Sequence, residues 1–142
     1  MANDRAQTDG PIARARAALD EEHRRLGDLV GRLREVRDPA ALAGLLDELH
    51  AALKAHFEHE EFPGGLYQSM GALGPRHAEL VRDLVDQHFL LLAAVRGLAD
   101  QARRAGPPTS PALLPDAVAL ADQLRAHEAD ENRLAERLLE EP

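Results

Sequence analysis

Residues 113–138 read LLPDAVALADQLRAHEADENRLAERL, and this stretch decides the fold. Alternating steps of four and three residues from its first leucine select one side of a helix, and we call such a row of positions a seam. Two of the selected side chains are polar, a histidine and the glutamate four residues after it. The seam contains Leu113, Ala117, Leu120, Leu124, His127, Glu131, Leu134 and Leu138. This spacing predicts an amphipathic helix with one polar pair on its buried side.

Three other segments have the same spacing. One repeats the polar pair, since a histidine is again followed four residues later by a glutamate, in the seam Leu42, Leu46, Leu49, Leu53, His56 and Glu60. The other two seams each have one histidine near the middle. They run through Ile12, Arg16, Leu19, His23, Leu26, Val30 and Leu33, and through Val81, Leu84, His88, Leu91, Val95 and Leu98.

Proline and glycine separate these segments, and β-branched residues are scarce, so the composition favours helix nearly everywhere. We predict helices over 11–37, 40–61, 76–104 and 112–140. Four helices with such seams are typical of an all-α fold, an up-down-up-down four-helix bundle. We expect this bundle to occupy residues 11–142 and to follow a disordered N-terminal segment at residues 1–10.

Composition excludes several classes of function. The chain has 142 residues, about one domain, and no cysteine, so any metal must be bound by His, Asp or Glu. Its formal net charge of −8 argues against partners such as nucleic acid or an anionic membrane. No apolar run approaches twenty residues, and the N-terminus is too polar for a signal peptide. We therefore expect a soluble, cytoplasmic protein.

The polar seam residues are predicted to lie at matching heights. Each seam histidine is 15 to 17 residues from the same end of the expected bundle, about 25 Å along a helix. The two seam glutamates are one turn further on. The four imidazoles therefore form one layer and the two carboxylates a second layer beneath it. The residues of these two layers are His23, His56, His88, His127, Glu60 and Glu131.

A metal site explains these layers, because burying unpaired charges costs several kcal/mol. Imidazole and carboxylate ligands together suit iron, manganese or zinc. Carboxylates that enter from opposite helices can bridge two ions about 3.5–4 Å apart. The alternative is a metal-free bundle with hydrogen-bonded core histidines, but the matched heights and the repeated His-x3-Glu pattern favour a dinuclear site.

The order of these motifs resembles the haemerythrin-like, HHE cation-binding family rather than the ferritin type. The resemblance spans nearly the whole chain and rests on His23, HFEHEE at 56–61, QH at 87–88 and HEADE at 127–131. It implies a non-haem centre of two iron ions, of the Fe–O–Fe type, with Glu60 and Glu131 as bridging carboxylates. Manganese or zinc can substitute for iron.

The chain departs in two ways from the pattern of oxygen-carrying haemerythrins. Those proteins look as if they need a second histidine one turn from the third-helix ligand, where this chain has Leu84 and Leu92. They also look as if they need an aspartate where this chain has Asn132. The sequence is thus closer to variants that imply iron sensing, peroxide decomposition or nitric-oxide chemistry.

Several other residues are near the predicted site. His77 is about 16.5 Å along the helix from His88, so both cannot bind one dinuclear site, and we choose His88. His59 is expected at the surface or behind a ligand, and Glu61 is expected in solvent or supporting a ligand imidazole. Tyr67 is in a long connection; it either hydrogen-bonds an oxygen species at an open iron position or caps the core.

Three functions follow from this interpretation. The first is a di-iron protein that binds or reacts with O₂, peroxide or NO, and if it is an enzyme, it is a peroxide- or NO-related oxidoreductase. The second is a non-catalytic iron or oxygen sensor that works by metal-dependent folding and signals through a protein partner. The third is a structural bundle without metal.

Overall fold

The computed structural model describes residues 10–105 and 111–140, and within these ranges every regular element is a helix. The all-α prediction is therefore confirmed. Of the predicted disordered N-terminal segment, residues 1–9 lie outside the described residues. The elements are α2 (Pro11–Ala18), α3 (Asp20–Glu35), the 3₁₀ turn η1 (Pro39–Ala41), α4 (Leu42–Glu61), α5 (Leu66–Gly71), α6 (Pro75–Arg104) and α7 (Leu113–Glu140).

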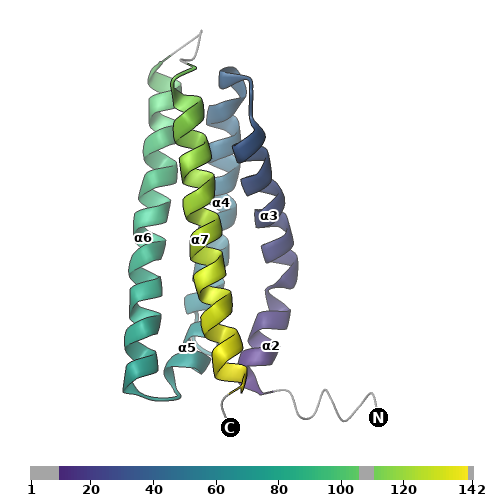
Figure 1. Cartoon of the computed structure of the whole chain (residues 1–142), viewed down its shortest axis with the longest axis vertical. Helices are drawn as coiled ribbons and strands as arrows, with labels where there is room; N and C mark the ends of the chain where they lie inside the picture. The colour runs from purple at the N-terminus through teal and green to yellow at the C-terminus, as the bar shows by residue number, and fades with distance from the viewer. Residues whose placement is uncertain (1–9, 106–110, 141–142) are drawn as a thin grey trace.

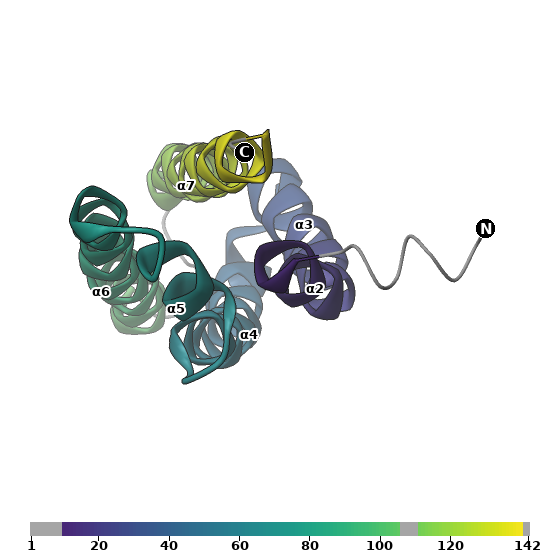
Figure 2. The same cartoon turned by 90° about the horizontal axis from the view of Figure 1, so that it is seen from below.

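The four long helices α3, α4, α6 and α7 lie side by side (Figures 1 and 2). Helix α4 packs against α3 and α6, and α7 packs against the same two helices from the other side. The two short helices, α2 and α5, lie together at the lower end of Figure 1 and contact each other. None of the described helices is both long and apolar enough to cross a membrane.

The predicted first helix, 11–37, is wrong in two respects, and the first is that it is interrupted at Leu19. There the backbone N–H bonds to the carbonyl of Arg16 at 3.0 Å, three residues back, which tightens the turn between α2 and α3. The helix also ends at Glu35, two residues early. The second helix begins with the turn η1, whose first free N–H, that of Ala40, is capped by the Asp38 carboxylate at 3.0 Å.

The connection after α4 contains a helix that the periodicity did not predict. Gly65 starts α5, and its N–H donates to the Phe62 carbonyl at 2.8 Å. A Cβ at Gly65 would lie 2.7 Å from the carbonyl oxygen of His59, so this tight turn requires glycine. The turn lets α5 bury Leu66, Tyr67 and Met70.

The apolar core consists of two clusters with a polar layer between them. Leu19, just before α3, belongs to the lower cluster, and Leu26 on α3 belongs to the upper cluster. On α7, Ala135 is in the lower cluster and Leu124 is in the upper cluster. On α6, Leu84 is in the lower cluster and Leu91 in the upper. The seam histidine of each of these helices lies in the interval between its two clusters. The fold thus places the polar seam residues at one level inside the bundle.

The turn at Gly65 gives a prediction about stability. Gly65→Ala should lower the free energy of unfolding by about 1–3 kcal/mol, because a methyl group there would collide with backbone carbonyls. The same substitution at Gly44 is the control, since a Cβ there meets no atom within 4 Å on an exposed position of α4. Gly44→Ala should stabilise by about 0.5–1 kcal/mol. Chemical denaturation measures both, and equal effects at the two positions would contradict the tight turn.

Candidate metal centre

The structure brings together all six polar seam residues predicted from the sequence. Helix α3 supplies one, α6 one, and α4 and α7 supply a histidine and a glutamate each, because residues four apart share a helix face. Five of the side chains are buried, with exposures of 0–6%. The sixth, His23, is 21% exposed. These residues are His23, His56, His88, His127, Glu60 and Glu131.

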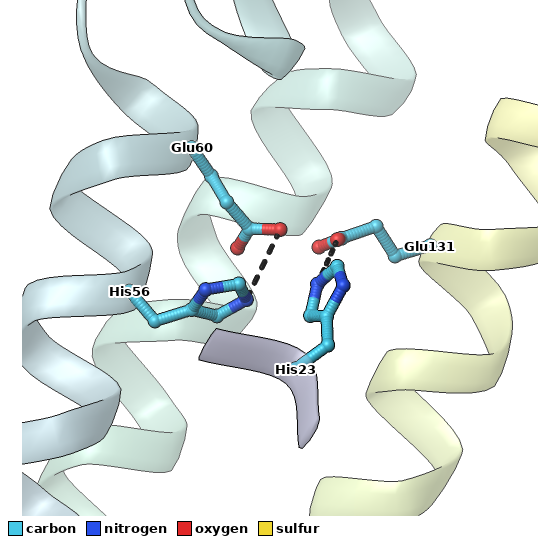
Figure 3. A group of neighbouring side chains, drawn as sticks. All are labelled: His23, His56, Glu60 and Glu131. Atoms are coloured by element: carbon cyan, nitrogen blue, oxygen red, sulfur yellow. Dashed lines mark ion pairs between the residues drawn. The ribbon is translucent and has the colours of Figure 1, made fainter. Parts of the chain in front are cut away.

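The side chains form two candidate ligand groups that share one carboxylate. The first group contains His23, His56, Glu60 and Glu131, which Figure 3 shows converging on one space between α3, α4 and α7. The second contains His88, His127 and Glu131. Within each group, the possible ligand atoms all lie within 4.8 Å of one another. Each group could therefore hold one ion, and the shared Glu131 would keep the two ions close together.

Each glutamate extends between two histidines of different groups. The Glu60 oxygens lie 3.5 Å from His56 Nε2 and 3.5 Å from His88 Nε2. The Glu131 oxygens lie 4.0 Å from His23 Nε2 and 3.7 Å from His127 Nε2. Both carboxylates therefore have the placement expected of bridging ligands, one oxygen toward each group.

Outward-facing hydrogen bonds orient three of the imidazoles. Nδ1 of His56 lies 2.9 Å from Glu22, and Nδ1 of His88 lies 3.0 Å from Glu61. Nδ1 of His127 lies 2.7 Å from the amide oxygen of Gln87. An ionised carboxylate or an amide oxygen can only accept, so each Nδ1 donates and each Nε2 presents its lone pair to the centre. Metal-binding imidazoles are commonly held in this way.

Most of the possible ligand atoms at the centre have no hydrogen-bond partner in the protein, which indicates whether a metal would fit. Buried atoms without a hydrogen bond include Nε2 of three histidines, both oxygens of Glu60 and Oε1 of Glu131. Each unsatisfied buried polar group destabilises the folded protein by about 1–3 kcal/mol, so several together would destabilise it strongly if no ligand bound them. The three histidines are His23, His56 and His127. Lone pairs that converge from nitrogen and carboxylate oxygen are what a transition-metal cation binds, so the residues fit a metal.

Burial shifts the charge states in the direction that metal binding needs. It lowers the pKa of all four seam imidazoles, and that of His88, next to His127 and His56, falls to about 3. The imidazoles are thus neutral and able to coordinate at neutral pH. Burial also raises the pKa of Glu60 far above that of a free carboxyl group, and Glu131 adds to this increase. A cation would reverse the effect on the carboxylate.

His23 has a different environment from the other three. Its Nε2 lies 3.2 Å from Glu128, a residue that sequence reasoning did not select. Burial, followed by the charge of Glu131, raises the pKa of Glu128 to about 7. The site is therefore more open at His23 than at the other three imidazoles.

The remaining sequence predictions have mixed outcomes. Glu61 does support the imidazole of His88, and His59 is exposed with its Nδ1 2.6 Å from Glu22. His77 is in neither ligand group. Tyr67 is buried in the lower apolar cluster, and its hydroxyl also reaches the centre.

Glu22 and Gln87 also hydrogen-bond imidazoles of the centre, and the sequence did not predict this role. The one hint in the sequence is that each residue directly precedes a seam histidine. The histidine that each one hydrogen-bonds, however, lies on another helix.

The comparisons with known proteins agree with this arrangement. A family model described as the hemerythrin HHE cation binding domain matches residues 14–139. No curated protein and no solved structure matches the chain significantly. The matched range includes all six converging residues and extends over most of the sequence. The chain therefore belongs to the hemerythrin HHE cation-binding domain family.

Proposed function

We propose that the protein binds two iron ions and uses them to bind or react with O₂, peroxide or NO. The observation that carries the proposal is the pair of ligand groups joined by carboxylates, with unpartnered buried nitrogen and oxygen atoms directed between them. A haemerythrin-like up-down-up-down topology of the long helices is part of this proposal. Manganese or zinc would fit the same donors.

In this proposal His23, His56, His88 and His127 are terminal ligands, and Glu60 and Glu131 bridge. Bound iron would supply redox chemistry and open coordination positions for a small ligand. The protein's own part is to hold the imidazoles neutral and oriented, and to exclude bulk water from buried carboxylates. If the protein is an enzyme, this arrangement favours peroxide- or NO-related oxidoreductase activity.

A small cavity beside the imidazoles supports a small, uncharged ligand. It has a volume of about 80 Å³ and lies between α3, α4 and α7, next to the rings of His23, His56 and His127. Most of its remaining wall is apolar, including Leu26 and Phe57. Such a space suits a diatomic molecule or peroxide better than a larger metabolite. Gly27, which is exposed, lies at its edge.

A second candidate function is a sensor that responds by metal-dependent folding and signals to a protein partner. The observation in its favour is the position of the polar layer between the two apolar clusters. Loss of metal would leave unpaired polar groups in the middle of the core, which would destabilise both halves. Thermal unfolding with and without chelator measures this coupling. Melting temperatures within a few degrees of each other would exclude the sensor.

Metal content and optical absorption test the main proposal. Protein expressed in iron-replete medium should contain two iron ions per chain and show visible charge-transfer absorption that changes when peroxide or azide is added. Iron content well below one ion per chain would favour a structural bundle. Two bound ions with no response to either reagent would exclude small-ligand chemistry.

Glu60→Gln should have opposite effects on the metal-free and metal-loaded forms. Without metal at pH 7, the folded protein holds a proton on Glu60 that the unfolded chain releases, so the variant should be more stable by about 1–3 kcal/mol. The gain should shrink as the pH falls toward 4.5, where the unfolded carboxyl is also protonated. With metal, the variant should lose most of the metal-induced stabilisation.

The control for this experiment is Glu58→Gln, the same change at an exposed position of the same helix. It should alter neither form by more than about 0.5 kcal/mol. Thermal denaturation of the metal-free and metal-loaded proteins at pH 7 and pH 4.5 measures all of these differences. If Glu60→Gln destabilised the metal-free protein at pH 7, Glu60 would be a structural residue and not a ligand.

Gly27→Leu should obstruct the cavity beside the imidazoles. A larger side chain at this position meets no existing atom at its Cβ, so the fold should be retained. The reaction of the iron-loaded protein with NO should slow several-fold in a stopped-flow measurement. Gly44→Leu, on an exposed part of α4, is the control and should leave the rate unchanged. Equal rates for both variants would show that ligands approach by another route.

A further inference from the structure

The second ligand group is smaller than the first, and it has room for a further donor. The first group has four residues, whereas the second has only His88, His127 and Glu131. The positions one turn from His88 on α6 are leucines, and both pack with the apolar core. Among the described His, Asp and Glu residues, only Glu60, with an oxygen 3.5 Å from His88 Nε2, could add to the second group. With Glu60 and Glu131 both bridging, an ion there would have two histidines and two carboxylates, which leaves room for a further donor.

Tyr67 reaches the second group from below. Its hydroxyl oxygen lies 2.7 Å from His88 Nε2 and donates to Glu131 Oε2 at 2.6 Å. The side chain is only 3% exposed, and the short helix α5 holds it beneath the imidazole layer. Both atoms that it approaches are the ones that the second ion would bind. The hydroxyl therefore lies among the donor atoms and not behind them.

One phenol proton cannot satisfy both of these contacts. Nδ1 of His88 donates to Glu61, so the Nε2 of the neutral ring can only accept. Glu131, as a carboxylate, also accepts. The hydroxyl donates to one of them, and the other close contact joins two lone pairs. A cation placed between the three atoms would satisfy all of them at once.

The spacing of the three atoms also suits coordination. Metal bonds to nitrogen and oxygen are about 2.0–2.2 Å long, so adjacent ligand atoms at right angles lie about 3 Å apart. The hydroxyl oxygen of Tyr67 lies at 2.6 and 2.7 Å from its two neighbours, close to that value. A residue that supported the ligands from outside would contact Nδ1, as Glu61 does, and not Nε2.

We propose that Tyr67 is a direct oxygen ligand of the ion held by His88 and His127. The inference rests on the proposed function, since it assumes a metal at the second group. On binding, the phenol O–H bond breaks, an oxygen–metal bond forms, and the proton leaves to solvent. No change of oxidation state is involved. Tyr67 then supplies the donor that the leucines beside His88 do not.

The sequence makes this ligand easy to detect, because Tyr67 is the only tyrosine and there is no tryptophan. The ferric form of the purified full chain should show a phenolate-to-iron charge-transfer band, and resonance Raman excitation in that band should enhance tyrosinate ring modes. Tyr67→Phe should abolish both signals. It should also weaken binding of one of the two ions by about tenfold or more in a competitive chelator titration.

Ser69→Ala is the matched control, since it removes a hydroxyl from the same short helix. That hydroxyl donates to the Gly65 carbonyl and not to the centre. The control should keep the band, the tyrosinate modes and both ions. If only Tyr67→Phe unfolded, the wild-type Raman spectrum alone would decide the question.

The outcomes separate this inference from the proposed function. Two ferric ions per chain without tyrosinate modes would overturn the role of Tyr67 and leave the di-iron proposal standing. A charge-transfer band that persists at full strength in Tyr67→Phe would also overturn it, because that variant contains no tyrosine. Absence of bound iron in the wild type would overturn the proposed function and, with it, this inference.

Discussion

The structure depends on one constraint: several polar groups are buried at one level between two apolar clusters. Five of the six side chains at this level are almost fully buried. Burial alone would leave neutral imidazoles, a protonated carboxyl at Glu60 and many lone pairs without donors. The membership of the chain in the hemerythrin HHE cation-binding domain family gives this arrangement a physical reason, since a cation stabilises what the protein alone leaves unsatisfied.

The surrounding residues are arranged to suit that cation. Glu22, Glu61 and Gln87 accept hydrogen bonds from the outer imidazole nitrogens and so fix which nitrogen faces inward. Two of these partners are carboxylates and one is an amide. The turn at Gly65 brings α5 beneath the centre. Its tyrosine both belongs to the lower apolar cluster and contacts His88 and Glu131.

Much of this arrangement could be predicted from the sequence, because it depends on helical periodicity. A helix has a fixed rise, so spacing alone placed four histidines from four helices in one layer and two glutamates in the layer beneath it. The break at Leu19 was not predictable in this way, since it is a local change in backbone hydrogen bonding. Helix α5 is too short to show a period. Glu22 and Gln87 contact histidines of other helices, and no spacing within one helix reveals such contacts.

The position of bound metal tests the central claim most directly. Anomalous scattering from a crystal of the iron-loaded protein locates each ion independently of any activity. The account predicts two peaks about 3.5–4 Å apart, one beside His23 and His56 and the other beside His88 and His127, with Glu60 and Glu131 between them. A single peak, or peaks away from these six side chains, would contradict it.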